Sequence, residues 1–394
     1  MKKSIFILLI LLTAAGSVWA QESFVSESDH YRVRSHISQN HADQAAERLE
    51  AYLDLFNDYF HFELDSLDFK MKVQIFNGQS AYDRYLNRVI DETRNEFVYL
   101  HYSDVSRSEL VGALEDGEDL DESFTHQAFI QFLRAFIDNP PLWLREGFAV
   151  YFEKARFNEN FVAVNNRENL AWLETLKEIL FGSRSNEALT PEEILAIDVE
   201  GAKDRIEAFY PEAWGMINYL VNTDNRSHNR ILWDAISAMD PRADLKTNSQ
   251  RVYNSAFQWV NQEELQNSFL EYFQNKKTYR ELIEEGIAEY ESGNLDSSEE
   301  NFLIAINRRD ISHIPYYYLG LINYDRGNYT LAELNYRKAL EKGSTAALTY
   351  YAMGVNAFAD NRLEEAQEFL ETTVQLDPSN YTQKVTRILE RIEG

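Results

Sequence analysis

Residues 314–341 read IPYYYLGLINYDRGNYTLAELNYRKALE, and their spacing of small and large residues recurs on both sides of them. Glycines stand 34 residues apart at Gly286, Gly320 and Gly354. A small residue follows each glycine after twelve positions, and a large one after four more: Ser298, Ala332 and Ala366, then Phe302, Tyr336 and Leu370. A period of this length predicts a stack of similar structural units, which bury a continuous core between neighbours.

These positions resemble the tetratricopeptide repeat (TPR) family over roughly residues 278–380. The resemblance implies an all-α solenoid of helical hairpins, in which the small residues lie where two helices touch. We expect three repeats and a capping helix over residues 276–394. The predicted capping helix carries an apolar stripe formed by Val385, Ile388, Leu389 and Ile392.

The first helix of each TPR hairpin lines a concave face, and the resemblance implies that this face is aromatic here. The candidate groove residues are Tyr290, Tyr317, Leu321, Tyr324, Tyr351 and Phe358. One interpretation is that these side chains only pack against neighbouring helices or the preceding domain. The other is a peptide-binding groove, because tyrosine supplies contact area and a hydroxyl donor at low entropic cost.

The residues before the repeats predict a small sheet followed by helices. Residues 31–37, 70–76 and 97–102 have the alternating or branched pattern of strands, and an amphipathic helix extends to about Phe60. After the acidic loop at 115–119 the pattern becomes helical almost to residue 275. Strands followed by a run of helices indicate an α+β domain.

Two segments in this region carry a recognisable motif. Residues 122–126 read ESFTH, and residues 142–153 read LWLREGFAVYFE after a Pro140-Pro141 break. They resemble the gluzincin metallopeptidases, specifically the peptidase MA-like (DUF1570-type) group that is associated with TPR repeats. Members carry H-E-x-x-H on one helix and W-L-x-E-G-x-A-x-Y-x-E on the next. The resemblance implies a zincin-like α+β domain over residues 21–275.

The motif departs from the family at two of its four chemical positions. His126 matches the second zinc histidine and Glu146 the third ligand, but Glu122 replaces the first histidine and Ser123 the glutamate that acts as general base. A serine hydroxyl is too weak a base to take a proton from metal-bound water, so we expect no catalytic residue. Glu122, His126 and Glu146 remain candidate metal ligands.

Three states of this site are compatible with the sequence. The first is an empty site without any cofactor, and the second is a structural or vestigial site that holds zinc, manganese or iron at low occupancy. The third is altered catalysis by an active metal-dependent hydrolase with an unusual Glu122, His126 and Glu146 ligand set.

Composition excludes several other classes of function. The chain has 394 residues, a formal charge of -27 and no cysteine, so thiolate metal sites, disulfides and a lipid anchor on cysteine are excluded. The acidic excess repels phosphate backbones, and we expect no nucleic-acid partner. Lys2 and Lys3, the apolar run 5–12 and the Val18-Trp19-Ala20 site predict a signal peptide over residues 1–20, with no later membrane span.

The sequence therefore predicts an exported protein, periplasmic or extracellular, with a catalytically inactive metallopeptidase-like domain. Its expected partner is a protein or peptide, bound through the TPR groove and the degenerate cleft. Besides the active hydrolase, a further alternative is that the first domain is only a rigid platform, with all partner contacts made by the repeats.

Overall fold

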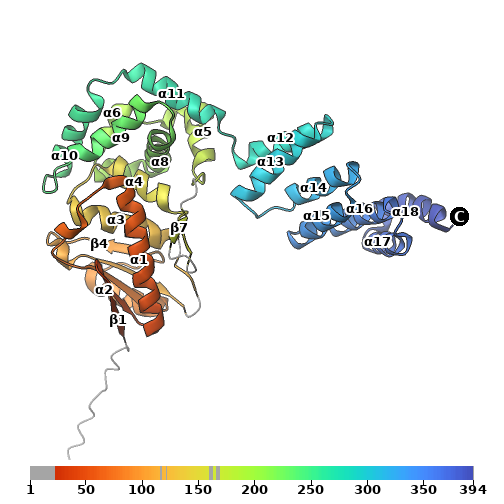
Figure 1. Cartoon of the computed structure of the whole chain (residues 1–394), viewed down its shortest axis with the longest axis horizontal. Helices are drawn as coiled ribbons and strands as arrows, with labels where there is room; N and C mark the ends of the chain where they lie inside the picture. The colour runs from red at the N-terminus through yellow and green to blue at the C-terminus, as the bar shows by residue number, and fades with distance from the viewer. Residues whose placement is uncertain (1–22, 116–117, 121, 159–162, 166–168, 394) are drawn as a thin grey trace, which may run out of the picture. The chain divides into compact units, whose positions relative to one another are not determined.

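The computed structural model describes residues 23–115, 118–120, 122–158, 163–165 and 169–393 (Figure 1). The predicted signal peptide at 1–20 lies outside these residues. The chain forms two compact units. The first runs to Asn169 and resumes over Leu189–Val260, and the second comprises Leu170–Ala188 and the chain from Asn261 onward. No helix of the described residues is long and apolar enough to cross a membrane.

A five-stranded mixed sheet forms the base of the first unit, in the order β1-β2-β3-β5-β4. Its strands are β1 (Phe24–Glu27), β2 (Tyr31–Ser35), β3 (Met71–Asn77), β4 (Val98–Leu100) and β5 (Glu109–Leu114). The three inner strands are parallel, whereas β1 and β4 pair antiparallel at the two ends of the sheet. Within the described residues, no strand pairs with the outer edge of β4.

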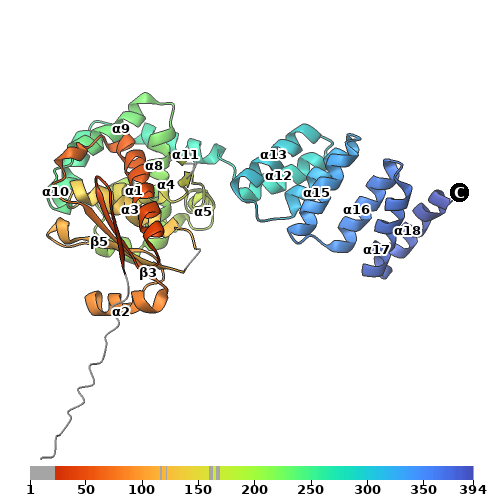
Figure 2. The same ribbon diagram turned by 60° about the horizontal axis from the view of Figure 1, so that its bottom comes forward.

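Helices cover both faces of this sheet, as Figure 2 shows. One face carries α1 (Gln39–Phe60) and α3 (Glu122–Phe136), and the other carries α2 (Gln79–Ile90). The core on the α1 side is aromatic. The ring of Phe56 lies 5.3 Å from that of Phe129 and 5.0 Å from that of Phe152, measured between centroids, and all three are fully buried. This packing fixes α3 against α1.

The remaining helices of the first unit build a layer over α3. They are α4 (Leu142–Phe152), α6 (Pro191–Ala196), α7 (Val199–Asp204), α8 (Ile206–Asn222), α9 (Arg226–Ala238) and α10 (Leu245–Val252). A short hairpin of β6 (Arg156–Asn158) and β7 (Ala163–Asn165) interrupts them. α4 and α8 touch at Gly147, where a Cβ would lie 2.5 Å from the carbonyl oxygen of Ala213. The absence of a side chain therefore sets how closely these helices approach.

The observed α+β arrangement confirms the predicted class of the first region. The strands predicted at 31–37, 70–76 and 97–102 correspond to β2, β3 and β4, each with shorter or shifted bounds. β1, β5, α2 and the β6–β7 hairpin were not predicted. β5 lies between β3 and β4, and Leu110, Val111 and Gly112 are buried in succession, so it lacks the apolar–polar alternation that marks a half-exposed strand.

The second unit is mostly helical and TPR-like. It contains α5 (Leu173–Phe181), α11 (Gln262–Asn275), the hairpins α12 (Tyr279–Glu291) with α13 (Leu295–Arg308), α14 (Ile314–Asp325) with α15 (Tyr329–Glu341), and α16 (Ala346–Ala359) with α17 (Leu363–Leu376), then α18 (Pro378–Glu393). These three hairpins and the last helix lie over the residues where repeats and a capping helix were predicted. Lys177 on α5 forms an ion pair of 2.8 Å with Glu281, which ties α5 to the first repeat. The predicted domain boundary at residue 275 lies within this unit.

The repeat glycines lie where the two helices of each hairpin touch. A Cβ on Gly320 would come within 2.3 Å of the ring of Tyr336, and one on Gly286 within 2.9 Å of the ring of Phe302. The turns between paired helices contain Gly293 and Gly327, whose φ angles of 83° and 75° are left-handed. Asn361 takes the same conformation 34 residues later, with φ of 59°. Asparagine tolerates this region better than most residues, so the third turn keeps its shape without glycine.

Candidate functional site

α3 and α4 bring two of the predicted site residues together in the interior of the first unit. The Nε2 atom of His126 lies 3.4 Å from a carboxylate oxygen of Glu146. Its Nδ1 atom lies 2.8 Å from a carboxylate oxygen of Glu153. Both His126 and Glu146 are largely buried, with side chains 12% and 7% exposed. A ring that meets carboxylates through both nitrogens is held as an imidazolium, which donates to each.

The charges of this cluster stabilise one another. Burial alone would lower the pKa of His126, but the hydrogen bonds and charges of Glu146 and Glu153 raise it to about 9. Burial opposes ionisation of Glu146, yet Arg145 and His126 lower its pKa to about 2. Arg145 Nε donates to Glu146 at 2.6 Å. The arrangement is therefore a buried network of ion pairs. His126 pairs with Glu146 and Glu153, and Arg145 pairs with Glu146.

α8 and the chain after α4 complete the surroundings of the network. Tyr210 on α8 interacts with Glu146. The pKa of the Tyr210 phenol is raised, mainly by burial and next by the charge of this carboxylate. Asn169 donates to the carbonyl oxygen of Val150 at 2.7 Å and to Glu153 at 3.5 Å. These contacts orient both carboxylates toward His126 from outside the pair of helices.

Glu122 takes a different place from the one predicted for a metal ligand. Its carboxylate accepts hydrogen bonds from Lys154 and, at 3.2 Å, from Arg156. Two nearby cations supply the counter-charge that a metal would have supplied. A zinc site of the implied kind needs at least three converging protein ligands. Among the residues that the structure describes, no three His, Asp or Glu side chains are arranged to hold a metal ion. The predicted ligand set therefore does not fit zinc here.

Ser123, which the resemblance placed where a general base would stand, bonds to the backbone of the sheet. Its hydroxyl oxygen accepts the N–H of Phe97 at 3.1 Å. One helical turn later, the side-chain oxygen of Gln127 accepts the N–H of Tyr99 at 3.2 Å. Both N–H groups belong to β4 or to the residue before it, on the edge away from β5. Ser123 and Gln127 together therefore hold this edge against α3, and the predicted cleft cannot pair a peptide backbone with these two groups.

The sequence contained signals for the functional residues that the prediction omitted. Glu153 follows Glu146 by seven residues, which is two turns of the same helix face. Gln127 follows Ser123 by four residues, so both face the same way. The contacts of Tyr210 and Asn169 depend on distant segments, and no local spacing indicates them.

The candidate groove residues of the repeats all lie half-buried on the first helices of the hairpins: Tyr290 on α12, Tyr317, Leu321 and Tyr324 on α14, and Tyr351 and Phe358 on α16. The hydroxyl of Tyr290 donates to Asp325 at 2.8 Å. The ring of Tyr351 lies 5.2 Å from that of Tyr381. The pKa of Tyr317 is raised to about 12, mainly by burial and to a smaller extent by the nearby hydroxyls of Tyr381 and Tyr318. The tyrosines thus pack laterally and still expose part of each ring.

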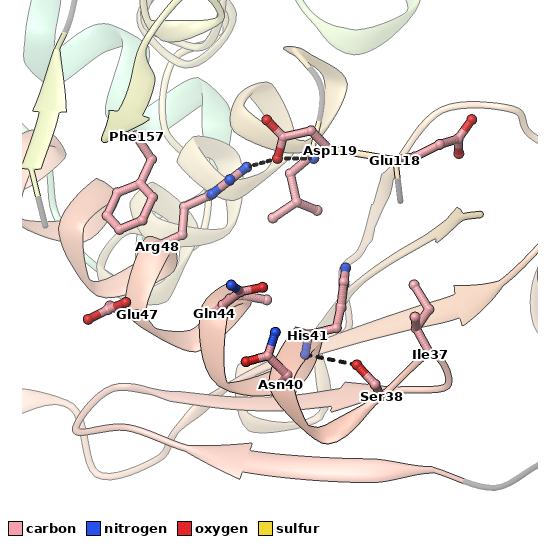
Figure 3. A pocket seen from close by; sticks show the side chains of 12 residues that line it. Ile37, Ser38, Asn40, His41, Gln44, Glu47, Arg48, Glu118, Asp119 and Phe157 are labelled. Atoms are coloured by element: carbon pink, nitrogen blue, oxygen red, sulfur yellow. Dashed lines mark hydrogen bonds and ion pairs between the residues drawn. The ribbon is translucent and has the colours of Figure 1, made fainter. Parts of the chain in front are cut away.

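The first unit also has two hollows whose linings do not include His126 or Glu146. One, of about 360 Å³, lies at the start of α1 (Figure 3). There Arg48 forms an ion pair of 2.6 Å with Asp119 and lies over the ring of Phe157. The other, of about 920 Å³, lies near the end of α1 and is lined by aromatic side chains that include Phe62, Phe136 and Trp233.

Comparisons with known proteins match two separate parts of the chain. Residues 122–241 match a family described as a protein of unknown function (DUF1570), and residues 283–347 match the tetratricopeptide repeat. The chain is thus a DUF1570 region followed by TPR repeats. The site residues from Glu122 to Tyr210 fall within the DUF1570 match. No curated protein matches the chain.

Two solved structures are similar to part of the chain. One is the first TPR of Spaghetti (RPAP3) bound to the HSP90 peptide SRMEEVD, and the other is the first TPR domain of the human RPAP3 protein, determined by NMR. Each is 19% identical and covers 29% of this chain and 94% of its own. The TM-scores are 0.28 and 0.27.

Proposed function

We propose that this chain is an exported binding protein whose peptidase-like domain has lost its chemistry and whose TPR face binds a peptide partner. TPR repeats suggest protein–protein binding, and the half-buried tyrosines of α12, α14 and α16 are the observation that carries the proposal. Tyrosine rings that are fixed by neighbours yet partly exposed bind with little loss of side-chain entropy. Lys2, Lys3 and the apolar run that follows them support export.

Loss of chemistry is supported by the partners of the motif residues. Ser123 uses its hydroxyl as a backbone acceptor, and a serine cannot replace a carboxylate as general base. His126 has a carboxylate at each ring nitrogen, and Glu122 pairs with two cations. On this proposal the peptidase MA-like ancestry survives as a packing arrangement, with no metal or other cofactor required for binding.

The full-length protein is expected to show no peptidase activity, whereas the double variant Glu122→His, Ser123→Glu should bind zinc more tightly. The two substitutions supply the missing imidazole and carboxylate one helical turn from His126. Isothermal titration should show at least a tenfold gain in zinc affinity over the parent. Adding His126→Leu should abolish that gain. A double variant that binds zinc no better than the parent would contradict the alignment of His126 and Glu146 with zinc ligands.

Tyr317→Leu and Tyr351→Leu should each weaken peptide binding by about tenfold, because a central tyrosine typically contributes more than 1 kcal/mol to an interface. The probes are peptides selected from a random library on the full-length protein, with affinities measured by fluorescence anisotropy. Tyr350→Leu is the matched control, since Tyr350 lies on α16 beside Tyr351 and packs toward Phe369. Unchanged affinities in both groove variants would refute the groove.

A further inference from the structure

Two arginines and a histidine meet beside the buried network of the first unit. Arg134 lies on α3, Arg145 on α4, and His101 follows the last residue of β4. Burial, together with the charges of Arg134 and Arg145, lowers the pKa of His101 to about 4. Burial likewise lowers the pKa of Arg134 to about 10, with Arg145 as the next cause. The three groups are therefore close enough to destabilise positive charge on one another.

Arg145 forms an ion pair with a neighbouring carboxylate, whereas Arg134 forms none within the described residues. Arg145 binds the carboxylate of Glu146 through two nitrogens, at 2.6 and 2.5 Å. Within the described part of the chain, Arg134 forms no ion pair, and its buried Nε atom has no hydrogen-bond acceptor. The Nδ1 atom of His101 is also buried without a partner there. Buried polar groups are almost always hydrogen-bonded, so the Nε atom of Arg134 and the Nδ1 atom of His101 are the two atoms here that a bound ligand would satisfy.

The nearby acidic groups limit the charge of that ligand. Glu146 and Asp138 act electrostatically on Arg134 without pairing with it. They would repel a dianion such as phosphate more strongly than an ion of single charge. A guanidinium also matches the planar geometry of a carboxylate. Arg134 and His101 are half-buried, and the side chain of Arg145 is 18% exposed, so a small ion can reach them from solvent.

We propose that Arg134, Arg145 and His101 form a subsite for a single carboxylate, either the C-terminal group of a peptide or a small free acid. Arg134 is the principal binding residue, because its guanidinium is the one without a protein carboxylate. Arg145 adds charge while it holds Glu146, and His101 borders the site from the end of β4. This inference goes beyond the proposed function, since it concerns the first unit and does not require the TPR groove.

The test is the melting temperature of the full-length protein in acetate, N-acetylphenylalanine, its amide or phosphate, each compared with chloride at equal ionic strength. At about 50 mM, N-acetylphenylalanine and acetate should raise the melting temperature by about 2 °C or more. The amide should have no effect, and phosphate a smaller one than acetate. A greater response to N-acetylphenylalanine than to acetate identifies the C-terminal group of a peptide as the source, and an equal one identifies a small acid.

Arg134→Met should abolish the carboxylate response, and in chloride it should melt no lower than the parent because it removes an unpaired buried charge. His101→Phe is a second variant that should weaken the response. The control Arg230→Met removes an exposed arginine, 77% accessible, and should leave the response intact. The proposal is overturned if Arg134→Met responds like the parent, if the amide acts like the acid, or if phosphate stabilises more than acetate.

Discussion

Gly320→Leu is expected to destabilise the repeats by about 3 kcal/mol or more. The Cβ alone would lie 2.3 Å from the ring of Tyr336, and that ring is 1% exposed. Tyr317 packs against the same ring at 5.9 Å between centroids, so the ring has little room to move away. Overpacking a well-packed site typically costs 1–3 kcal/mol, and here the clash begins at the first side-chain atom. Chemical denaturation, followed by circular dichroism, measures the change.

Two further variants show whether the cause is the helix contact. Gly320→Ala should lose less stability than Gly320→Leu, since it adds one carbon atom to the same clash. Gly327→Ala is the matched control, because no atom lies within 4 Å of its added Cβ and only the left-handed φ opposes it. Its cost should be about 1 kcal/mol. If Gly320→Ala and Gly327→Ala lost the same free energy of unfolding, the contact with Tyr336 would not explain why residue 320 is glycine.

Glu146→Leu is expected to destabilise the first unit by about 3–5 kcal/mol. The substitution leaves Arg145 without its partner and removes one of two carboxylates from His126, and the side chains of both are mostly buried. Removing one member of a buried ion pair strands the opposite charge in a medium that solvates it poorly. Thermal and urea unfolding of the full-length protein, with and without a chelator, measure the loss.

The chelator distinguishes an ion-pair network from a metal site. A network of protein charges predicts the same parent stability in its presence and absence, whereas a bound metal predicts a loss. Glu284→Leu is the control, because Glu284 is exposed on α12 and its change should stay within about 0.5 kcal/mol. A Glu146→Leu variant as stable as the parent would show that the network contributes nothing to the fold.

The repeats were predictable because their constraints lie close together in the sequence. Gly320 must meet Tyr336 within one hairpin, and the same demand recurs every 34 residues, so the spacing alone indicates the structure. The pattern also tolerates a change of residue type. At the third turn Asn361 stands where the first two repeats have glycine, and its φ angle is left-handed as well. In contrast, β5 depends on neighbours from distant parts of the chain, and its composition does not distinguish a strand from a buried helix.

The candidate site was predictable only in part for the same reason. His126 and Glu146, which the motif named together as candidate ligands, lie 3.4 Å apart between α3 and α4. The pairing of Glu122 with Lys154 and Arg156 depends on where the chain turns after α4, which no motif describes. The motif predicted no catalytic role for Ser123, but only the structure shows the contact with Phe97 that its hydroxyl makes.

That contact has a consequence for how this molecule behaves among copies of itself. A bare strand at the end of a sheet is a template on which another chain can pair, and such edges promote aggregation. At β4 two outward N–H groups are already satisfied, because Ser123 and Gln127 accept them from α3. A foreign strand would have to break both bonds before it could add to the sheet. Ser123 and Gln127 therefore protect the sheet from edge-to-edge association.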